Sequence, residues 1–222
     1  MVSAAEGNDR AMATSNPYPT AAAFMPDTLS LTALREAVQG CRGCPLYANA
    51  TQAVFGEGLK TSEVMLVGEQ PGDQEDLAGA PFVGPAGKLL DHALEEAGVD
   101  RKKAYVTNAV KHFKWKARGK RRIHDKPTWT EQMACRPWLD AEIALVKPRA
   151  LVLMGATAGQ SVLGKSFRVT QHRGVAIPSD LAELVTATIH PSAVLRGEDR
   201  EELFQGLVDD LRIVADHLAS AT

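Results

Sequence analysis

Three cysteines and one histidine form the first set of residues that could do chemistry. Cys41 and Cys44 are separated by two residues, a spacing that lets one turn of backbone present two thiolates to one metal. Cys135 lies far downstream, and we take His112 as the fourth ligand because the helix expected around Cys135 begins just beyond it. Three thiolates and an imidazole suit zinc as well as an iron–sulfur cluster, and buried free thiols are the remaining alternative.

Three polar segments form a second set, because each begins where a short apolar run ends. They are the loop 68–72, with the sequence GEQPG, and the residues Asn108 and His190. Glycines at the end of a strand let backbone N–H groups approach a ligand closely. Taken singly, each has a plain alternative: a tight turn, a strand-end cap and a surface histidine.

A basic run is the third feature. Between positions 111 and 126, Asp125 is the only acid, although the whole chain has a formal net charge of −2. A cluster of basic residues in an otherwise neutral protein indicates a local surface that binds phosphate groups, and a solvated mobile loop is the alternative. Gly119 and Pro127 favour a loop. The basic residues are Lys111, Lys114, Lys116, Arg118, Lys120, Arg121, Arg122 and Lys126.

Short apolar runs that alternate with helical patterns must position these residues. We expect strands at 64–67, 105–107, 150–155 and 184–189, with helices at 31–40, 89–97, 133–146, from 156 onward and 203–214. Such alternation predicts a mostly parallel sheet covered on both faces. Ligands of such sheets bind at the carboxyl ends of the strands, so the three polar segments can converge on one crevice.

Length and composition set the outer limits. A chain of 222 residues fits one large α/β domain, which we place at residues 27–222. Residues 1–26 are rich in small and polar residues and are expected to form a disordered tail. No apolar run reaches the length of a membrane span, so we expect a soluble protein. An odd number of cysteines argues against a disulfide framework.

Several motifs together resemble family 4 uracil-DNA glycosylases. The loop GEQPG at 68–72 continues into PFVG at 81–84 and GKLL at 87–90, like the first active-site motif of that family. The letters VTNAVK at 106–111 resemble its second block, and HPS at 190–192 resembles its last motif. The resemblance implies a three-layer α/β/α sandwich with a central mostly parallel sheet and a 4Fe–4S cluster. It also implies a bacterial cytoplasmic protein, which we expect to be a monomer.

Three departures from the family pattern resemble its UdgX-type branch. His112 stands where the family usually carries a cysteine, and Gln70 stands where it usually carries alanine. The run KRRIH at 120–124 is an addition. Members of this branch remain covalently attached to uracil-containing DNA through the histidine of that run. The resemblance therefore assigns the fourth cluster ligand to His112 and the covalent role to His124.

The chemistry of uracil excision suggests further roles. Phe82 would stack on the flipped base, and the amide of Asn108 would match uracil O4 and N3–H, which cytosine reverses. His190 could donate a hydrogen bond to uracil O2 as negative charge develops, while Glu69 could stabilise the sugar cation, orient water or position the base. Gln70 and Asp73 are expected beside the substrate. The expected DNA contacts are Lys120, Arg121, Arg122, Ser192 and Arg196.

In an ordinary glycosylase, water attacks the sugar, whereas here we expect neutral His124 to attack instead. Neighbouring arginines would disfavour its protonated form and grip phosphates. The expected partners are uracil-containing DNA, single-stranded by preference, and uracil. Two alternatives remain open: a conventional multiple-turnover family 4 enzyme, and a non-catalytic nucleic-acid-binding module with an iron–sulfur brace.

Overall fold

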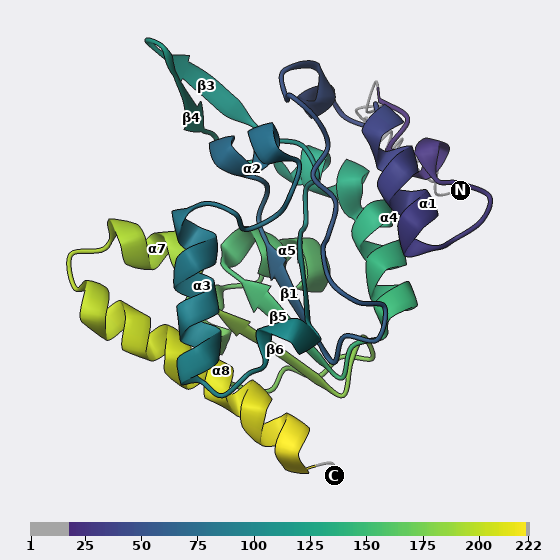
Figure 1. Cartoon of the computed structure of the whole chain (residues 1–222). Helices are drawn as coiled ribbons and strands as arrows, with labels where there is room; N and C mark the ends of the chain where they lie inside the picture. Colours follow the sequence, from purple (N-terminus) through teal and green to yellow (C-terminus); the bar gives the residue numbers. More distant parts are fainter. Residues whose placement is uncertain (1–17, 221–222) are drawn as a thin grey trace, which may run out of the picture.

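The centre of the protein is a parallel four-stranded sheet in the order β2-β1-β5-β6 (Figure 1). The computed structural model describes residues 18–220. Every residue of the four strands is buried, as expected of a parallel sheet covered on both faces, and the apolar runs predicted from the sequence coincide with these strands. The strands are β1 (Val64–Gly68), β2 (Ala104–Asn108), β5 (Ala150–Met154) and β6 (Leu184–Thr188).

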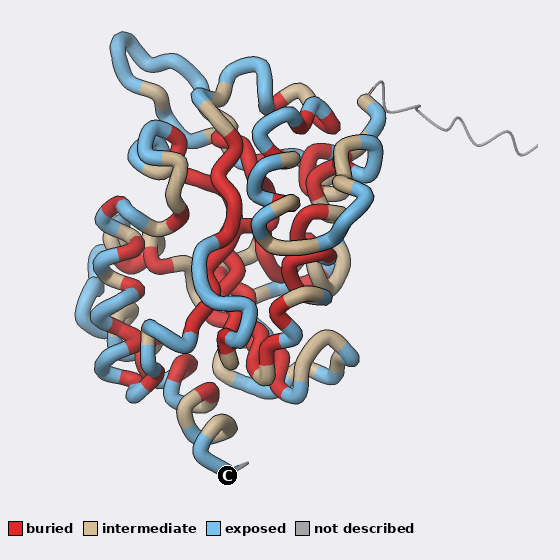
Figure 2. Tube along the Cα trace, turned by 45° about the vertical axis from the view of Figure 1, so that its right-hand side comes forward, coloured by how far each residue is buried: buried red, intermediate tan, exposed pale blue. Residues whose placement is uncertain are grey.

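Helices cover both faces of this sheet, which confirms the three-layer α/β/α architecture. Leu66 and Val106 face one side and pack against α3, α7 and α8. Met65 and Leu151 face the other side and pack against α4 and α5. Figure 2 shows the buried chain running through the middle of the molecule. The helices are α3 (Pro85–Glu96), α4 (Trp129–Val146), α5 (Ala156–Leu163), α6 (Val169–His172), α7 (Pro191–Arg196) and α8 (Arg200–Ser220).

The strand order creates a switch point between β1 and β5. The chain leaving β1 passes through α2 (Asp73–Ala78) to α3 on one face, whereas the chain leaving β5 enters α5 on the other face. Two neighbouring parallel strands whose connections diverge in this way leave a crevice outside their carboxyl ends. The polar segments at Gly68, Asn108 and His190 all open onto that edge.

The amino-terminal segments form a further cluster on α4, and it contains all three cysteines. Ala21 is fully buried within this cluster, so the packed structure begins before residue 27, where we had placed the end of the tail. Residues 1–17 of the expected tail lie outside the described part of the chain. The elements of this region are η1 (Ala21–Phe24), α1 (Leu31–Ala37), η2 (Val38–Gly40) and η3 (Pro45–Ala48), and η4 (Arg101–Lys103) precedes β2.

The basic segment is a β-hairpin, not the loop that we expected. Strands β3 (Trp115–Arg118) and β4 (Arg121–His124) pair antiparallel, and Gly119 at the turn has a φ of 61°. Such a left-handed conformation is what glycine supplies in a tight hairpin. The hairpin extends from the end of the sheet that carries the crevice (Figure 1). None of the described helices combines the length and apolar character needed to cross a membrane.

Candidate active site

A pocket of about 610 Å³ lies at the carboxyl ends of the strands. All four strands of the sheet contribute to its wall through the residues that end or follow them, and the hairpin adds residues from β4. Of the residues that we selected from the sequence, the pocket brings together Glu69, Gln70, Phe82, Asn108, His124, His190, Ser192 and Arg196.

Gly68, the last residue of β1, forms the floor of the site. A methyl group on Gly68 would lie 2.8 Å from Phe82 Cζ and 3.4 Å from His190 Nε2, and it would also collide with Asn108 Oδ1. The absence of a side chain at Gly68 therefore lets three polar or aromatic groups converge on one point. The rings of Phe82 and His190 are stacked, with centroids 6.2 Å apart and an interplanar angle of 28°.

Phe82 is held in an unusual backbone conformation by the loop around it. Its φ of 57° lies in the left-handed region, which bulky residues rarely adopt, and such strain is typical of functional sites. Glu75 fixes this loop because its carboxylate accepts hydrogen bonds from Gly72 N at 3.0 Å and Gly84 N at 2.8 Å. We had not given Glu75 a role, although a carboxylate three residues after a helix N-cap is a capping-box signal.

His190 presents one defined ring nitrogen to the pocket. Its Nδ1 accepts a hydrogen bond from Ser192 N at 3.2 Å and lies 2.8 Å from Ser192 Oγ, so the proton of the neutral ring is on Nε2. Burial lowers the pKa of His190 to about 4, which keeps the ring neutral near pH 7. Ser192, which we expected to contact DNA, therefore orients His190.

Glu69 lies between Thr157 and His124. Thr157 Oγ1 donates a hydrogen bond to Glu69 Oε2, and His124 Nε2 lies 3.1 Å from Glu69 Oε1, which has no hydrogen-bond partner among the described residues. Burial acts to raise the pKa of Glu69, but the contacts with His124 and Thr157 outweigh it and hold that pKa below its usual value. Thr157 carried no sequence signal beyond its place just after a strand.

Gln70 uses its amide group to hold the base of the hairpin. Its Nε2 donates to the carbonyl oxygens of Lys114 and Asp125, each at 3.1 Å, and its Oε1 accepts from Lys114 N at 3.0 Å. Gln70 lines the pocket as expected, but these three hydrogen bonds occupy the groups that we had expected to face the substrate.

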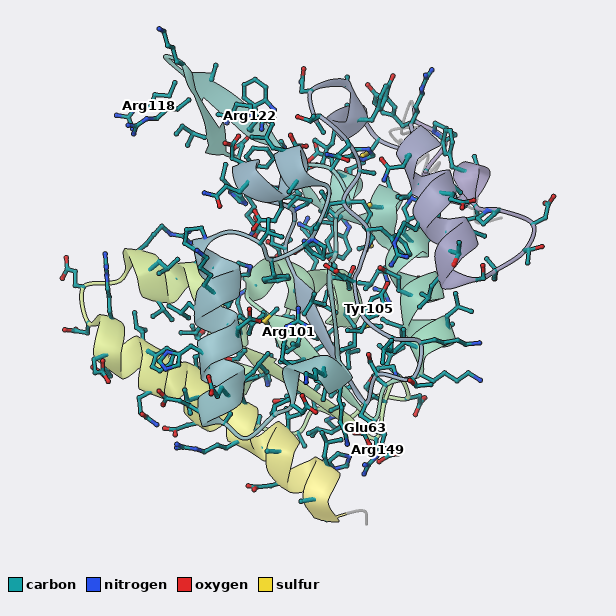
Figure 3. All side chains as sticks on the ribbon, viewed as in Figure 1. Glu63, Arg101, Tyr105, Arg118, Arg122 and Arg149 are labelled. Atoms are coloured by element: carbon teal, nitrogen blue, oxygen red, sulfur yellow. The ribbon has the colours of Figure 1, made fainter. Side chains whose placement is uncertain are left out.

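Arg122 is bound to acids of the protein, contrary to its expected contact with phosphate. Its guanidinium lies 2.6 Å from Asp73 and 2.6 Å from Asp76, and it stacks over the rings of Phe113 and Trp115 at 5.5 and 5.7 Å. Asp73 is correspondingly absent from the pocket wall and serves as a partner of Arg122. Figure 3 shows Arg122 on the side of the hairpin that faces α2, with Arg118 projecting away.

The basic run therefore divides into two groups. Lys111, Lys114, Lys116 and Arg122 are paired with acids, so they do not form a free phosphate footprint. Lys111 is completely buried, and its Nζ lies 2.5 Å from Glu142 and 2.8 Å from the carbonyl oxygen of Asn108. Within the basic run 111–126, the cations that have no ion-pair partner among the described residues are Arg118, Lys120, Arg121 and Lys126.

The three cysteines lie in one buried cluster and have the donor chemistry of an iron–sulfur site. Burial raises the pKa of Cys44 to about 11 and that of Cys135 to about 12. Lys111 N donates to Cys135 Sγ at 3.3 Å, and Trp138 Nε1 donates to Cys41 Sγ at 3.3 Å. Hydrogen bonds to ligand sulfurs of this kind tune iron–sulfur clusters.

His112 is buried and directly follows Lys111, whose backbone N–H contacts Cys135. Burial lowers its pKa to about 4, so the imidazole is neutral, as a metal ligand must be. Across residues 18–220, no three His, Cys, Asp or Glu side chains stand close enough to hold one metal ion. A closed zinc site needs all its ligands about 2.0–2.3 Å from one ion. A four-iron cluster takes its ligands on separate irons, so those ligands do not have to meet at one point.

The fold and pocket define an α/β/α protein with a pocket at its strand ends, and comparisons place it in a family. Residues 55–212 match the Uracil DNA glycosylase superfamily, and the chain belongs to that superfamily. A Type-4 uracil-DNA glycosylase of Thermotoga maritima is 40% identical over 167 residues, which cover 75% of this chain and 83% of the relative. One of Sulfurisphaera tokodaii is 35% identical over 184 residues, covering 79% of this chain and 80% of the relative.

Proposed function

We propose that this protein recognises uracil in DNA and cleaves its N-glycosidic bond. The observation that carries the proposal is the convergence of Phe82, Asn108 and His190 on the bare floor at Gly68. A uracil inside a duplex is out of reach, so the base must be flipped out or met in single-stranded DNA. The names of the relatives, Type-4 uracil-DNA glycosylases, support the same reaction.

Recognition falls to Phe82 and Asn108. The ring of Phe82 offers a face on which the base can stack. Asn108 is the last residue of β2 and is buried, and its backbone carbonyl accepts a hydrogen bond from Lys111 Nζ, so its backbone is held at the edge of the pocket and its amide offers one donor and one acceptor there. Uracil satisfies that pair through O4 and N3–H, whereas cytosine would leave both groups wrongly paired, at a cost of about 1–3 kcal/mol for each.

Bond cleavage places positive charge on the sugar and an electron pair on uracil N1. His190 Nε2–H donates a hydrogen bond to uracil O2 and so stabilises the leaving anion. Glu69, whose pKa is held below its usual value, is ionised and faces the developing sugar cation. Both groups line the same pocket.

We further propose that His124 attacks the anomeric carbon. The bond from C1′ to uracil N1 breaks first and its electrons leave with uracil, and a ring nitrogen of neutral His124 then forms a new bond to the electron-poor C1′ of the sugar cation. The imidazole then loses its other ring proton to solvent, and the uracil anion gains one. In support, His124 lines the same pocket as Asn108 and lies 3.1 Å from Glu69.

Single-stranded DNA would cross the pocket mouth along the unpaired cations. Lys120 and Arg121 on the hairpin and Arg196 at the end of α7 are the groups that we assign to phosphates. We assign the 4Fe–4S cluster to Cys41, Cys44, Cys135 and His112. Such a cluster would brace the segment around the cysteine pair against α4, and visible absorbance with stoichiometric iron and sulfide in anaerobic protein would test it.

One experiment separates the candidate functions. Uracil-containing single-stranded DNA is incubated with the protein, and the mixture is analysed on denaturing gels and for released uracil. We expect a heat- and SDS-resistant adduct that His124→Ser abolishes, while His92→Ser, a matched change at an exposed histidine of α3, leaves it intact. Free uracil without an adduct would identify a multiple-turnover glycosylase, and binding without any uracil release would identify a non-catalytic module.

A further inference from the structure

The hairpin that carries His124 rests on the segment that leaves the cysteine pair. Residues 49–52 follow η3, which begins directly after Cys44. Trp115, the first residue of β3, donates a hydrogen bond from its indole Nε1 to the carbonyl oxygen of Asn49 at 2.8 Å. Trp115 is also the residue directly opposite His124 in the hairpin ladder. Opposed residues of an antiparallel pair move together, so this contact restrains the backbone of His124.

Arg122 makes a second contact with the same segment. Its Nη1 donates to Thr51 Oγ1 at 3.2 Å, and Thr51 N in turn donates to Asp76 Oδ1 at 2.9 Å. Gln52 completes the connection, since its Nε2 donates to the carbonyl oxygen of Asp76 at 3.0 Å. Residues 49–52, which we call the platform, therefore contact β3, β4 and α2 together.

The hairpin depends on contacts at its base, which come from the platform, from Gln70 and from the acids that bind Arg122, because its own strands bury little. Each of its strands has four residues, and apart from Trp115 and Arg122 all of them are exposed. A two-stranded hairpin without a hydrophobic face is marginally stable in water. The side chain of His124 is itself 50% exposed, so packing around the imidazole does not hold it in place. Its position depends on contacts at the base of the hairpin.

We propose that the platform sets the position of His124 and that Trp115 is its main positioning residue. Trp115 is not among the residues that line the pocket, so it acts through the strand pair that it forms with His124. This inference rests on the proposed covalent role of His124. It predicts that loosening Trp115 reduces attack by His124 while leaving base release, which depends on residues of the central sheet, nearly unchanged.

The test uses Trp115→Phe, which keeps an aromatic ring beneath Arg122 but removes the indole N–H. Thr51→Val, which removes the hydroxyl acceptor of Arg122, probes the second contact. Trp129→Phe, at the first residue of α4, is the matched control. Amide hydrogen exchange of residues 115–124 is measured by mass spectrometry, together with the ratio of adduct formed to uracil released on single-stranded DNA.

Loss of one hydrogen bond predicts about 3- to 10-fold faster exchange in the hairpin of Trp115→Phe and a similar fall in the adduct-to-release ratio. Thr51→Val should act in the same direction and Trp129→Phe should match the wild type. Unchanged exchange in both platform variants would overturn the inference, as would equal losses of adduct and release. If the wild type forms no adduct, the covalent role fails, whereas the exchange measurement still decides whether the platform holds the hairpin.

Discussion

Gly68 offers the sharpest test of the pocket, because only one methyl group needs to be added. In Gly68→Ala the new Cβ would lie 2.8 Å from Phe82 Cζ, about 1 Å inside an ordinary carbon contact, and would collide with Asn108 Oδ1. Gly68 has no left-handed φ, so alanine fits the backbone. The change therefore acts on the space above β1 and not on its conformation.

The expected loss follows from the displaced groups. Asn108 must turn its amide away from the base, which forfeits a buried hydrogen-bond pair worth about 1–3 kcal/mol. Shifting Phe82 adds an overpacking cost of about 1–3 kcal/mol when the base is bound. We expect the sum, about 2–6 kcal/mol, to lower kcat/KM for uracil release by between about 30-fold and about 2 × 10⁴-fold. The free protein can move the Asn108 amide into the empty pocket, so the free energy of unfolding should fall by only about 1 kcal/mol.

Single-turnover release of uracil from single-stranded DNA measures the first effect, and urea unfolding measures the second. Gly40→Ala is the matched control, because nothing lies within 4 Å of a methyl group at that position. Uracil release at the wild-type rate by Gly68→Ala would refute the placement of the base over Gly68. A large loss of stability would show that the glycine serves folding and not the pocket.

Three further outcomes test the charges around the site. Glu142→Gln leaves Lys111 buried without a counter-charge and should lower the free energy of unfolding in urea by about 3–5 kcal/mol, much of which Lys111→Met should restore. Uracil release should stay level as pH falls through 6.5 and decline only near pH 4, the lowered pKa of His190, so a decline in release centred near 6.5 would contradict the assignment. The free energy of unfolding should fall as pH drops from 6.5 to about 4, because His190 of the unfolded chain binds its proton at a higher pH than His190 of the folded chain. Lys120→Ala should reduce the salt dependence of single-strand binding by about 0.7 in log–log slope, whereas Arg122→Ala should leave that slope unchanged.

The sheet and its crevice were predictable because their signals are local. A buried parallel strand is a continuous apolar run, and Val64–Gly68 ends in the glycine that the pocket requires. Asn108 and His190 each follow such a run, so alternation of strands and helices was enough to bring them to one edge. Helix α4 begins at Trp129, four residues before our expected start at Met133, because Thr128 and Glu131 form a capping box there.

The hairpin was not predictable in this way, because its structure depends on partners far along the chain. Arg122 is fixed by Asp73 and Asp76, and Gln70 is 44 residues from Lys114. In the sequence, Lys111 is one more cation of a basic run, whereas in the structure it is buried against Glu142 on α4. Charge composition indicated phosphate binding for the basic run that contains both Lys111 and Arg122, and only the fold distinguishes the cations that already have acid partners.

The two histidines of the pocket differ in their surroundings and in the roles that we propose for them. His190 begins α7, where Ser192 occupies its Nδ1, and burial lowers its pKa to about 4, so it remains a neutral donor through Nε2. His124 stands on an exposed hairpin, has no helix to fix its ring, and faces the carboxylate of Glu69. A rigid donor suits stabilisation of a leaving anion, whereas a nucleophile must advance toward the sugar once the base has gone. The proposed chemistry thus requires His190 to come from the end of the sheet and His124 from an exposed hairpin whose base is held at Gln70, Arg122 and Trp115.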